Sequence, residues 1–154
     1  MKRIALLVLC GLLAACSTGP TRRVSEPSAN IQQLTVRADG SWAIDLRIDN
    51  FSSVPMRFDR VSLALTVGGE NAGTLQGTPG LSIGPEAADV AALTLAPSAA
   101  AKIVVADALA RGASVSYRLD GTIDAATEDG KAHGYDIERE NALNPVPGLT
   151  GVLR

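Results

Sequence analysis

Residues 42–49 read Trp-Ala-Ile-Asp-Leu-Arg-Ile-Asp, with apolar side chains at every second position. Successive side chains of a β-strand point to opposite faces, so this period of two predicts a strand with one buried face and one wet face. The same alternation predicts clear strands at residues 61–67 and 114–120. We expect the inward-facing residues of these three strands to share one core: Trp42, Ile44, Leu46, Ile48, Val61, Leu63, Leu65, Val67, Val115, Tyr117 and Leu119.

Further strands are predicted on either side of these segments, where the alternation is weaker. Turn sequences separate them, among them Asp39-Gly40, Gly84-Pro85 and the Gly-Gly-Glu-Asn of residues 68–71. Many short strands with turns between them predict an all-β, mainly antiparallel fold, a sandwich or a barrel of about seven strands. The weaker strands are expected at residues 31–37, 71–76, 90–95, 122–125 and 131–139.

Residues 97–112 do not show the alternation of apolar and polar residues. Ser98 suits the start of a helix, the alanines after it favour a helix interior, and Gly112 suits the position just past a helix end. The β-branched run 103–105 favours a strand instead. We expect one short helix or helical turn that links two strands.

Composition and charge exclude several classes of protein. The chain of 154 residues is 46% hydrophobic and 19% charged, which does not fit an intrinsically disordered protein. The net charge of −2 and the five aromatic residues argue against nucleic acid as a partner. One histidine and two cysteines are too few for most metal sites and nucleophile–base pairs. We therefore expect no enzyme activity, no cofactor, no metal and no small-molecule substrate.

Individual candidates for chemistry have simpler interpretations. His133 is predicted to be an exposed strand residue rather than a catalytic base. Asp45 and Asp49 lie four residues apart on one strand, about 13 Å at 3.3 Å per residue, which is too far for a glycosidase pair. The acidic stretch 124–130 lacks the alternating oxygen ligands of an EF-hand loop and is predicted to be an ordinary hairpin.

The first residues have the features of an export signal. Lys2-Arg3 precedes the apolar run 4–15, which is shorter than the roughly 20 residues of a membrane-spanning helix. The run ends in Leu13-Ala14-Ala15-Cys16, which resembles the lipobox of bacterial lipoproteins. The resemblance implies cleavage before Cys16, lipidation of that residue and anchoring in a membrane. Ser17 follows where lipoproteins of the inner membrane often carry Asp, so we expect the periplasmic face of the outer membrane.

Three segments follow from this interpretation. Residues 1–15 are the signal peptide, residues 16–30 are the lipidated cysteine with a flexible tether, and residues 31–154 are the folded domain. The tether is assigned because residues 17–30 are polar, contain two prolines and have no apolar period.

Several short motifs resemble the late embryogenesis abundant group 2 family, also called the WHy (water stress and hypersensitive response) domain. In that family a strand ends in Asn-Pro-Asn with a proline downstream, and Asn50 and Pro55 match the first and last of these positions, while Phe51-Ser52 departs from the middle. Ile83-Gly84-Pro85 resembles the loop before the family's middle strand. Residues 117–121, Tyr-Arg-Leu-Asp-Gly, resemble its Tyr-x-Leu-x-Gly strand and turn.

The resemblance covers about residues 31–140. It implies an immunoglobulin- or fibronectin-III-like β-sandwich without catalytic residues, and a protective role in desiccation or other stress. The alternative is a binding module that docks a partner in a periplasmic or outer-membrane complex, so client or envelope proteins are the expected partners. The candidate contact loops contain Asn50, Phe51, Pro55, Gly84 and Pro85, and a turn-stabilising role is expected for the Asn50 side chain.

Overall fold

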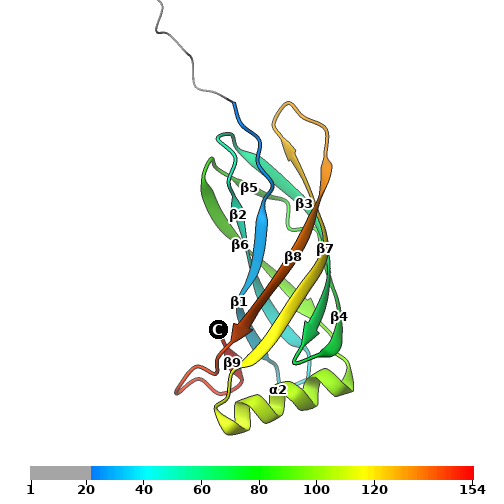
Figure 1. Cartoon of the computed structure of the whole chain (residues 1–154), viewed down its shortest axis with the longest axis vertical. Helices are drawn as coiled ribbons and strands as arrows, with labels where there is room; N and C mark the ends of the chain where they lie inside the picture. The colour runs from blue at the N-terminus through cyan, green and yellow to red at the C-terminus, as the bar shows by residue number, and fades with distance from the viewer. Residues whose placement is uncertain (1–21) are drawn as a thin grey trace, which may run out of the picture.

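The alternating stretch at residues 42–49 lies in strand β2 (Trp42–Asn50), at the heart of the smaller of two antiparallel sheets. In the computed structural model, which describes residues 22–154, the strand order of this sheet is β6-β2-β1-β9 (Figure 1). β1 and β6 flank β2 over its whole length, because their alternating side chains bury the same face. The other strands of this sheet are β1 (Ser28–Val36), β6 (Ala87–Leu95) and β9 (Val152–Leu153).

The larger sheet is ordered β4-β3-β7-β8, with the short β5 also paired to β3. Its two long central strands, β3 and β7, run antiparallel to each other over most of their lengths. The strands are β3 (Met56–Val67), β4 (Glu70–Gly77), β5 (Leu81–Ile83), β7 (Val115–Thr127) and β8 (His133–Leu143).

The two sheets enclose one hydrophobic core. All eleven residues predicted to share a core are buried, and they belong to one cluster of buried apolar side chains. Asp45, Arg47 and Asp49 lie on the opposite, outer face of β2, where Arg47 pairs with Asp49. The prediction of an all-β sandwich is confirmed, with nine strands in the described part of the chain because β5 and β9 add to the expected seven.

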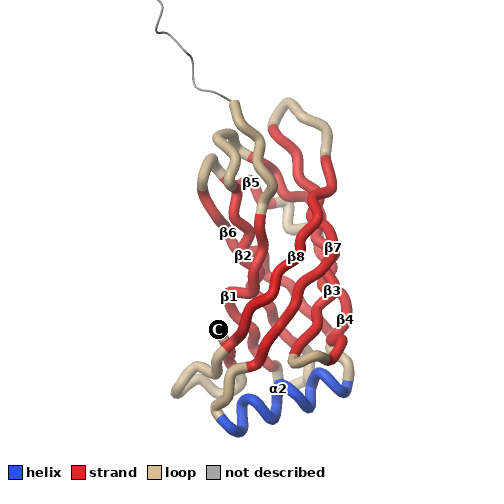
Figure 2. Tube along the Cα trace, viewed as in Figure 1, coloured by secondary structure: helices blue, strands red, loops and turns tan. Residues whose placement is uncertain are grey.

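Within residues 97–112 the chain forms a helix, α2 (Ala99–Arg111), which lies across one end of the strands (Figure 2). The Ser98 side chain accepts a hydrogen bond from the Ala101 N–H, and Gly112 has the left-handed conformation with φ 62°. Ala101, Val105 and Ala108 face the core. The caps and the alanines thus outweigh the β-branched residues 103–105, of which Ile103 is exposed to solvent.

Two strand boundaries differ from the prediction. Residues 114–120 and 122–125 were expected to be separate strands, but both lie in the continuous strand β7, so the turn expected at Gly121 is absent. A Cβ atom at Gly121 would lie 2.3 Å from the Ser62 carbonyl oxygen, so glycine is needed for close packing on β3 rather than for a turn. β3 begins at Met56 rather than at residue 61, because a shift of register between Phe58 and Arg60 interrupts the alternation.

The N-terminal part of the described chain is bound to the sandwich. β1 begins at Ser28, three residues before the predicted start of the domain at residue 31. Ahead of it, the Arg23 N–H donates to the Ser53 hydroxyl at 2.8 Å and the Ser25 N–H donates to the Ser52 hydroxyl at 3.0 Å. Residues 1–15 and Cys16 lie outside the described residues, so the signal peptide and the lipid anchor remain predictions.

The sandwich has two distinct ends (Figure 1). We call one the N-terminal end: it holds residues 22–27, the β2–β3 loop 51–55 and the β5–β6 loop 84–86. We call the other the helix end: it holds the turn 37–41, helix α2 and the segment 144–151.

Candidate functional site

The side chain of Asn50 connects the two loops that the sequence selects as contact loops. Its Nδ2 group donates to the carbonyl oxygens of Val54, Ile83 and Gly84 at 3.0, 3.1 and 2.9 Å. Its Oδ1 atom accepts the Ser52 N–H at 2.9 Å. Asn50 therefore holds the 51–55 loop against the 84–86 loop and stabilises the turn as predicted.

Asn50 is itself 1% exposed, so it cannot be a contact residue for a partner. Asn50 and the fully buried Ser52 are the buried polar residues within 22–154. An amide and a hydroxyl are tolerated in such a place because hydrogen bonds satisfy them, and no buried side-chain N or O atom of the described chain lacks a partner. The expected role of Asn50 in contact is corrected to a structural one.

The other predicted contact residues do reach the surface. Phe51, Pro55, Gly84 and Pro85 are exposed, and the Phe51 side chain is 50% exposed. They lie at the N-terminal end, because β2 runs antiparallel to β1 and its last residues pair with the start of β1, with Asp49 opposite Ser28. Any tether that leads into β1 therefore reaches the domain beside these loops.

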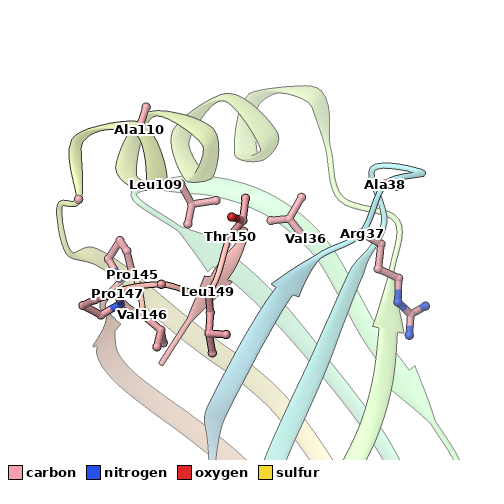
Figure 3. Close-up of a pocket in the computed structure, with 13 residues that line it drawn as sticks. Val36, Arg37, Ala38, Leu109, Ala110, Pro145, Val146, Pro147, Leu149 and Thr150 are labelled. Atoms are coloured by element: carbon pink, nitrogen blue, oxygen red, sulfur yellow. The ribbon is translucent and has the colours of Figure 1, made fainter.

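A groove lies at the helix end. It has a volume of about 780 Å³ and opens between the end of β1, the last turn of α2 and the segment before β9. Figure 3 shows the side chains of Val36, Leu109 and Thr150 around it, with Pro145 to Leu149 along one side. Its volume lies within the roughly 300–1,000 Å³ of ligand-binding pockets in general.

Backbone hydrogen bonds fix the walls of this groove. The Val36 N–H donates to the Gly151 carbonyl at 2.8 Å, and the Val146 N–H donates to the Val152 carbonyl at 2.9 Å. At the start of the segment, Asn144 and Arg154 exchange two backbone hydrogen bonds, of 2.6 and 2.9 Å. The groove is therefore built into the last strand of the smaller sheet.

The chemistry of the groove is apolar. Its lining contains valine, leucine, alanine, proline and glycine, the hydroxyl of Thr150, and Arg37 as its charged residue. The Arg37 side chain is directed away from Leu109 and Leu149 (Figure 3), and it donates to the Thr94 hydroxyl. Leu149 is 50% exposed. Such a surface can bury apolar side chains of a partner, and it offers no group for acid–base chemistry.

The titratable groups with shifted pKa values lie elsewhere and have structural causes. Burial raises the pKa of Tyr117, whose hydroxyl accepts a hydrogen bond from the Ile31 N–H at 3.0 Å. Glu140, together with Glu138, raises the pKa of Arg118 on the outer face of the larger sheet. The Ser41 hydroxyl and N–H donate to the Asp39 carboxylate, and these hydrogen bonds lower the pKa of Asp39 in the turn 37–41.

The candidates for catalysis and metal binding are not brought together. His133 is exposed at the start of β8, where its ring contacts Tyr135 with centroids 4.9 Å apart. Asp124 of the acidic stretch lies 3.7 Å from Arg60. Within residues 22–154 no group of three or more His, Cys, Asp or Glu side chains could hold a metal ion. Nor is any helix in this range long and apolar enough to cross a membrane.

Sequence reasoning missed the groove because its walls come from three distant parts of the chain. A signal existed in residues 145–149, Pro-Val-Pro-Gly-Leu, where turn residues enclose apolar ones. A loop that keeps valine and leucine beside prolines is a candidate for an exposed apolar surface.

No protein-family model and no curated protein matches this chain. Among solved structures, the solution structure of AT1g01470 from Arabidopsis thaliana is similar, with 11% identity, 88% of this chain and 92% of that chain covered, and a TM-score of 0.53. A protein from Archaeoglobus fulgidus is 13% identical over 80% of this chain and 98% of its own, with a TM-score of 0.47. At2g46140.1, described provisionally as a late embryogenesis abundant protein, is 15% identical over 95% and 88%, with a TM-score of 0.46. At 11% identity, the likeness to AT1g01470 concerns the fold alone.

Proposed function

We propose that this protein is a non-enzymatic, lipid-anchored protein of the cell envelope whose β-sandwich binds another envelope protein. The observation that carries the proposal is the apolar groove at the helix end, with its half-exposed Leu149. Exposed apolar surface in a soluble domain favours contact with a partner, because burying it releases about 25 cal/mol per Å².

The partner that fits this groove best is a polypeptide with apolar side chains. The walls contain neither carboxylates nor imidazoles, and the one guanidinium is directed away from Leu109, so the groove offers no charged group to a small polar ligand. Aliphatic or aromatic anchor residues that fill a pocket contribute most of the binding free energy in many protein complexes.

The absence of enzyme activity is part of the proposal. The one histidine of the chain, His133, is the first residue of β8 and pairs with Ala125 of β7. Ala125 lies near the end of β7 that is distant from the groove. A nucleophile needs a base within hydrogen-bonding reach, and the groove contains no such base. Neither a cofactor nor a small-molecule substrate is therefore proposed.

The anchor part of the proposal rests on the sequence ending Leu13-Ala14-Ala15-Cys16 and on Ser17 after it. Several acyl chains on Cys16 hold a protein stably on a bilayer, which one chain does not. We propose the periplasmic face of the outer membrane. In a Cys16→Ala variant the protein should be found unprocessed or in the soluble fraction, and its flotation with membranes at normal mass would contradict the anchor.

Photo-crosslinking in intact cells tests the groove. A photo-reactive amino acid replaces Leu149 in the full chain, and a matched variant carries it in place of Phe51, which is equally exposed at the other end. The proposal predicts one reproducible adduct from position 149 that is absent from position 51. The identified partner, once purified, should bind the purified full-length protein. A diffuse set of adducts from both positions would contradict a specific docking surface.

Stress protection is a second candidate, and the outer face of the larger sheet favours it. This face carries hydroxyl and charged side chains across its strands, including Ser62, Thr66, Thr122 and the ion-paired Arg118 and Glu138. Such a hydrated surface suits a protein that shields others during water loss. A labile enzyme dried with this protein should then keep more activity than with an equal mass of serum albumin, and equal activity would exclude the protective role.

A further inference from the structure

The N-terminal end of the sandwich has the features of a surface that rests on lipid. Among the described residues the exposed large hydrophobic side chains are Val24, Phe51, Ile103 and Leu149, and the first two belong to this end. Val24 is 48% exposed and Phe51 is 50% exposed, although each lies in a segment that is held by hydrogen bonds.

The two exposed side chains are fixed relative to each other. The Ser53 N–H donates to the Arg23 carbonyl at 2.9 Å, and the Arg23 guanidinium donates to the Phe51 carbonyl at 3.1 Å. The hydroxyl of Ser52 accepts the Ser25 N–H. These bonds connect the residues on both sides of Val24 to the loop that carries Phe51, so the two apolar side chains stand on one hydrogen-bonded edge of the sandwich.

The length of chain before this edge determines what can reach it. Cys16 precedes Arg22 by six residues, and a fully extended chain covers at most about 3.6 Å per residue, so the two lie within about 22 Å of each other. The twelve residues of β3 extend the sandwich by about 40 Å towards the helix end. A bilayer that holds lipids on Cys16 is therefore near the N-terminal end and distant from the groove.

We propose that Val24 and Phe51 insert into the headgroup region of the phospholipid bilayer that holds the anchor, an inference that rests on the proposed lipidation of Cys16. Phenylalanine and aliphatic side chains favour this shallow region, where apolar area leaves water. Arg22 and Arg23 beside them pair with Asp129 and Glu86 across exposed contacts of 3.4 and 3.5 Å. Exposed pairs of this kind are weak, so the Arg22 guanidinium can turn to a lipid phosphate at little cost, while Arg23 keeps its hydrogen bond to the Phe51 carbonyl.

This orientation directs α2 and the groove away from the membrane. It also explains why a soluble domain keeps Phe51 outside its core although the fully buried Asn50 and Ser52 flank it. Three acidic residues close to this edge, Glu26, Glu86 and Asp129, outnumber Arg22 and Arg23, so the contact depends on the anchor and on apolar insertion rather than on net charge.

Tryptophan fluorescence in vesicles tests the orientation. The full-length lipidated protein is reconstituted into phosphatidylcholine vesicles with brominated acyl chains, as Phe51→Trp and as the matched Leu149→Trp. Both positions are 50% exposed, and the native Trp42, 1% exposed in the core, gives the same background in each. The expected result is a loss and a shift to shorter wavelength of the added emission for Phe51→Trp, with neither for Leu149→Trp.

Equal quenching of both variants, or of neither, would overturn the inference. Failure of the anchor gives a different signal, because the wild-type protein would then fail to float with the vesicles and its N-terminal peptide would carry no acyl mass. Near-ultraviolet circular dichroism of both variants confirms that each keeps the native packing.

Discussion

The Nδ2 atom of Asn50 lies 2.9 Å from the carbonyl oxygen of Gly84, and this hydrogen bond joins two loops that are 34 residues apart in the chain. The same amide group also reaches the carbonyls of Val54 and Ile83. One buried side chain thus determines how the β2–β3 and β5–β6 loops are arranged at the N-terminal end. Phe51 directly follows Asn50 in the chain, so the hydrogen bonds of Asn50 also position Phe51, whose side chain is exposed.

Replacing Asn50 with Ala should destabilise the domain by about 3 kcal/mol, since it leaves buried backbone groups without partners. Asn50→Asp should cost at least as much, because a carboxylate cannot donate to three carbonyl oxygens. Denaturant titration measures both. Asn144→Ala, at an exposed asparagine of the helix end, serves as the control and should stay within about 0.5 kcal/mol. An equally small loss for Asn50→Ala would show that water replaces the amide.

Two glycines form a matched pair with opposite expectations. A Cβ at Gly121 would lie 2.3 Å from the Ser62 carbonyl, while a Cβ at Gly84 would meet nothing within 4 Å. Gly121→Ala should therefore lower the free energy of unfolding by about 2–4 kcal/mol, and Gly84→Ala should leave it within about 0.5 kcal/mol. Thermal unfolding of the two variants compares them directly. Similar melting temperatures would contradict the close approach of β7 to β3.

The core carries the stability of a domain in which residues 22–154 contain no cysteine. Leu63 is fully buried in β3, so Leu63→Ala should cost about 2–5 kcal/mol through lost contacts and the cavity left behind. Asp45→Asn, on the outer face of β2, should change the free energy of unfolding by less than about 0.5 kcal/mol. Urea titration separates the two, and a loss below about 1 kcal/mol for Leu63→Ala would place this residue outside the packed core.

Tyr117 should make stability depend on pH in the alkaline range. Burial raises the pKa of its hydroxyl in the folded protein above the pKa of about 10 that tyrosine has in the unfolded chain. At a pH between these two pKa values the unfolded chain has lost the hydroxyl proton, while the folded chain keeps it. The contribution of Tyr117 to stability is then constant below about pH 10 and is lost as the pH rises further.

The Tyr117→Phe variant isolates this effect. It removes the acceptor of the buried Ile31 N–H, which should cost about 1–3 kcal/mol at neutral pH. The difference in stability between wild type and variant should shrink above about pH 10, where the wild type loses its own contribution. Tyr135→Phe controls for the loss of another tyrosine hydroxyl. A difference that stays constant up to pH 11, a pH about one unit above the ordinary pKa of tyrosine, would show that burial does not perturb Tyr117.

The architecture could be predicted because alternation is a local property. The strand at residues 42–49 and the eleven core positions follow from side chains two residues apart, and the helix follows from Ser98 and Gly112. The start of β3 could not be predicted in this way, since the bulge near Asp59 shifts the inward positions by one. Gly121 has a turn-forming residue type, but its role depends on the distance to Ser62 in another strand.

The candidate site was predicted less well, because it depends on contacts between residues that are distant in the sequence. The loops containing Asn50 and Gly84 were selected only as candidate contact loops, and their hydrogen bonds to each other through Asn50, like the burial of Asn50, depend on three carbonyls from two loops. The groove at the helix end requires Val36, Leu109 and Leu149 to line one hollow, and although residues 145–149 indicate an exposed apolar loop, nothing in the local sequence indicates which parts of the chain lie opposite it. Antiparallel order alone explains why the selected loops lie beside the incoming chain.

The most direct measurement of the central claim compares two surface variants in intact cells. A photo-crosslinking residue replaces Ala110, which lines the groove and is exposed, and the yield of the specific adduct is measured in Leu149→Asp and in Ile103→Asp backgrounds. Both substitutions add one charge at an exposed apolar side chain, and Ile103 lies on α2 outside the groove lining. We predict that Leu149→Asp lowers the adduct yield by more than about tenfold, the effect of losing about 1.4 kcal/mol from a central apolar contact, while Ile103→Asp preserves it. An unchanged yield in Leu149→Asp, or an equal loss in both, would contradict binding through the groove.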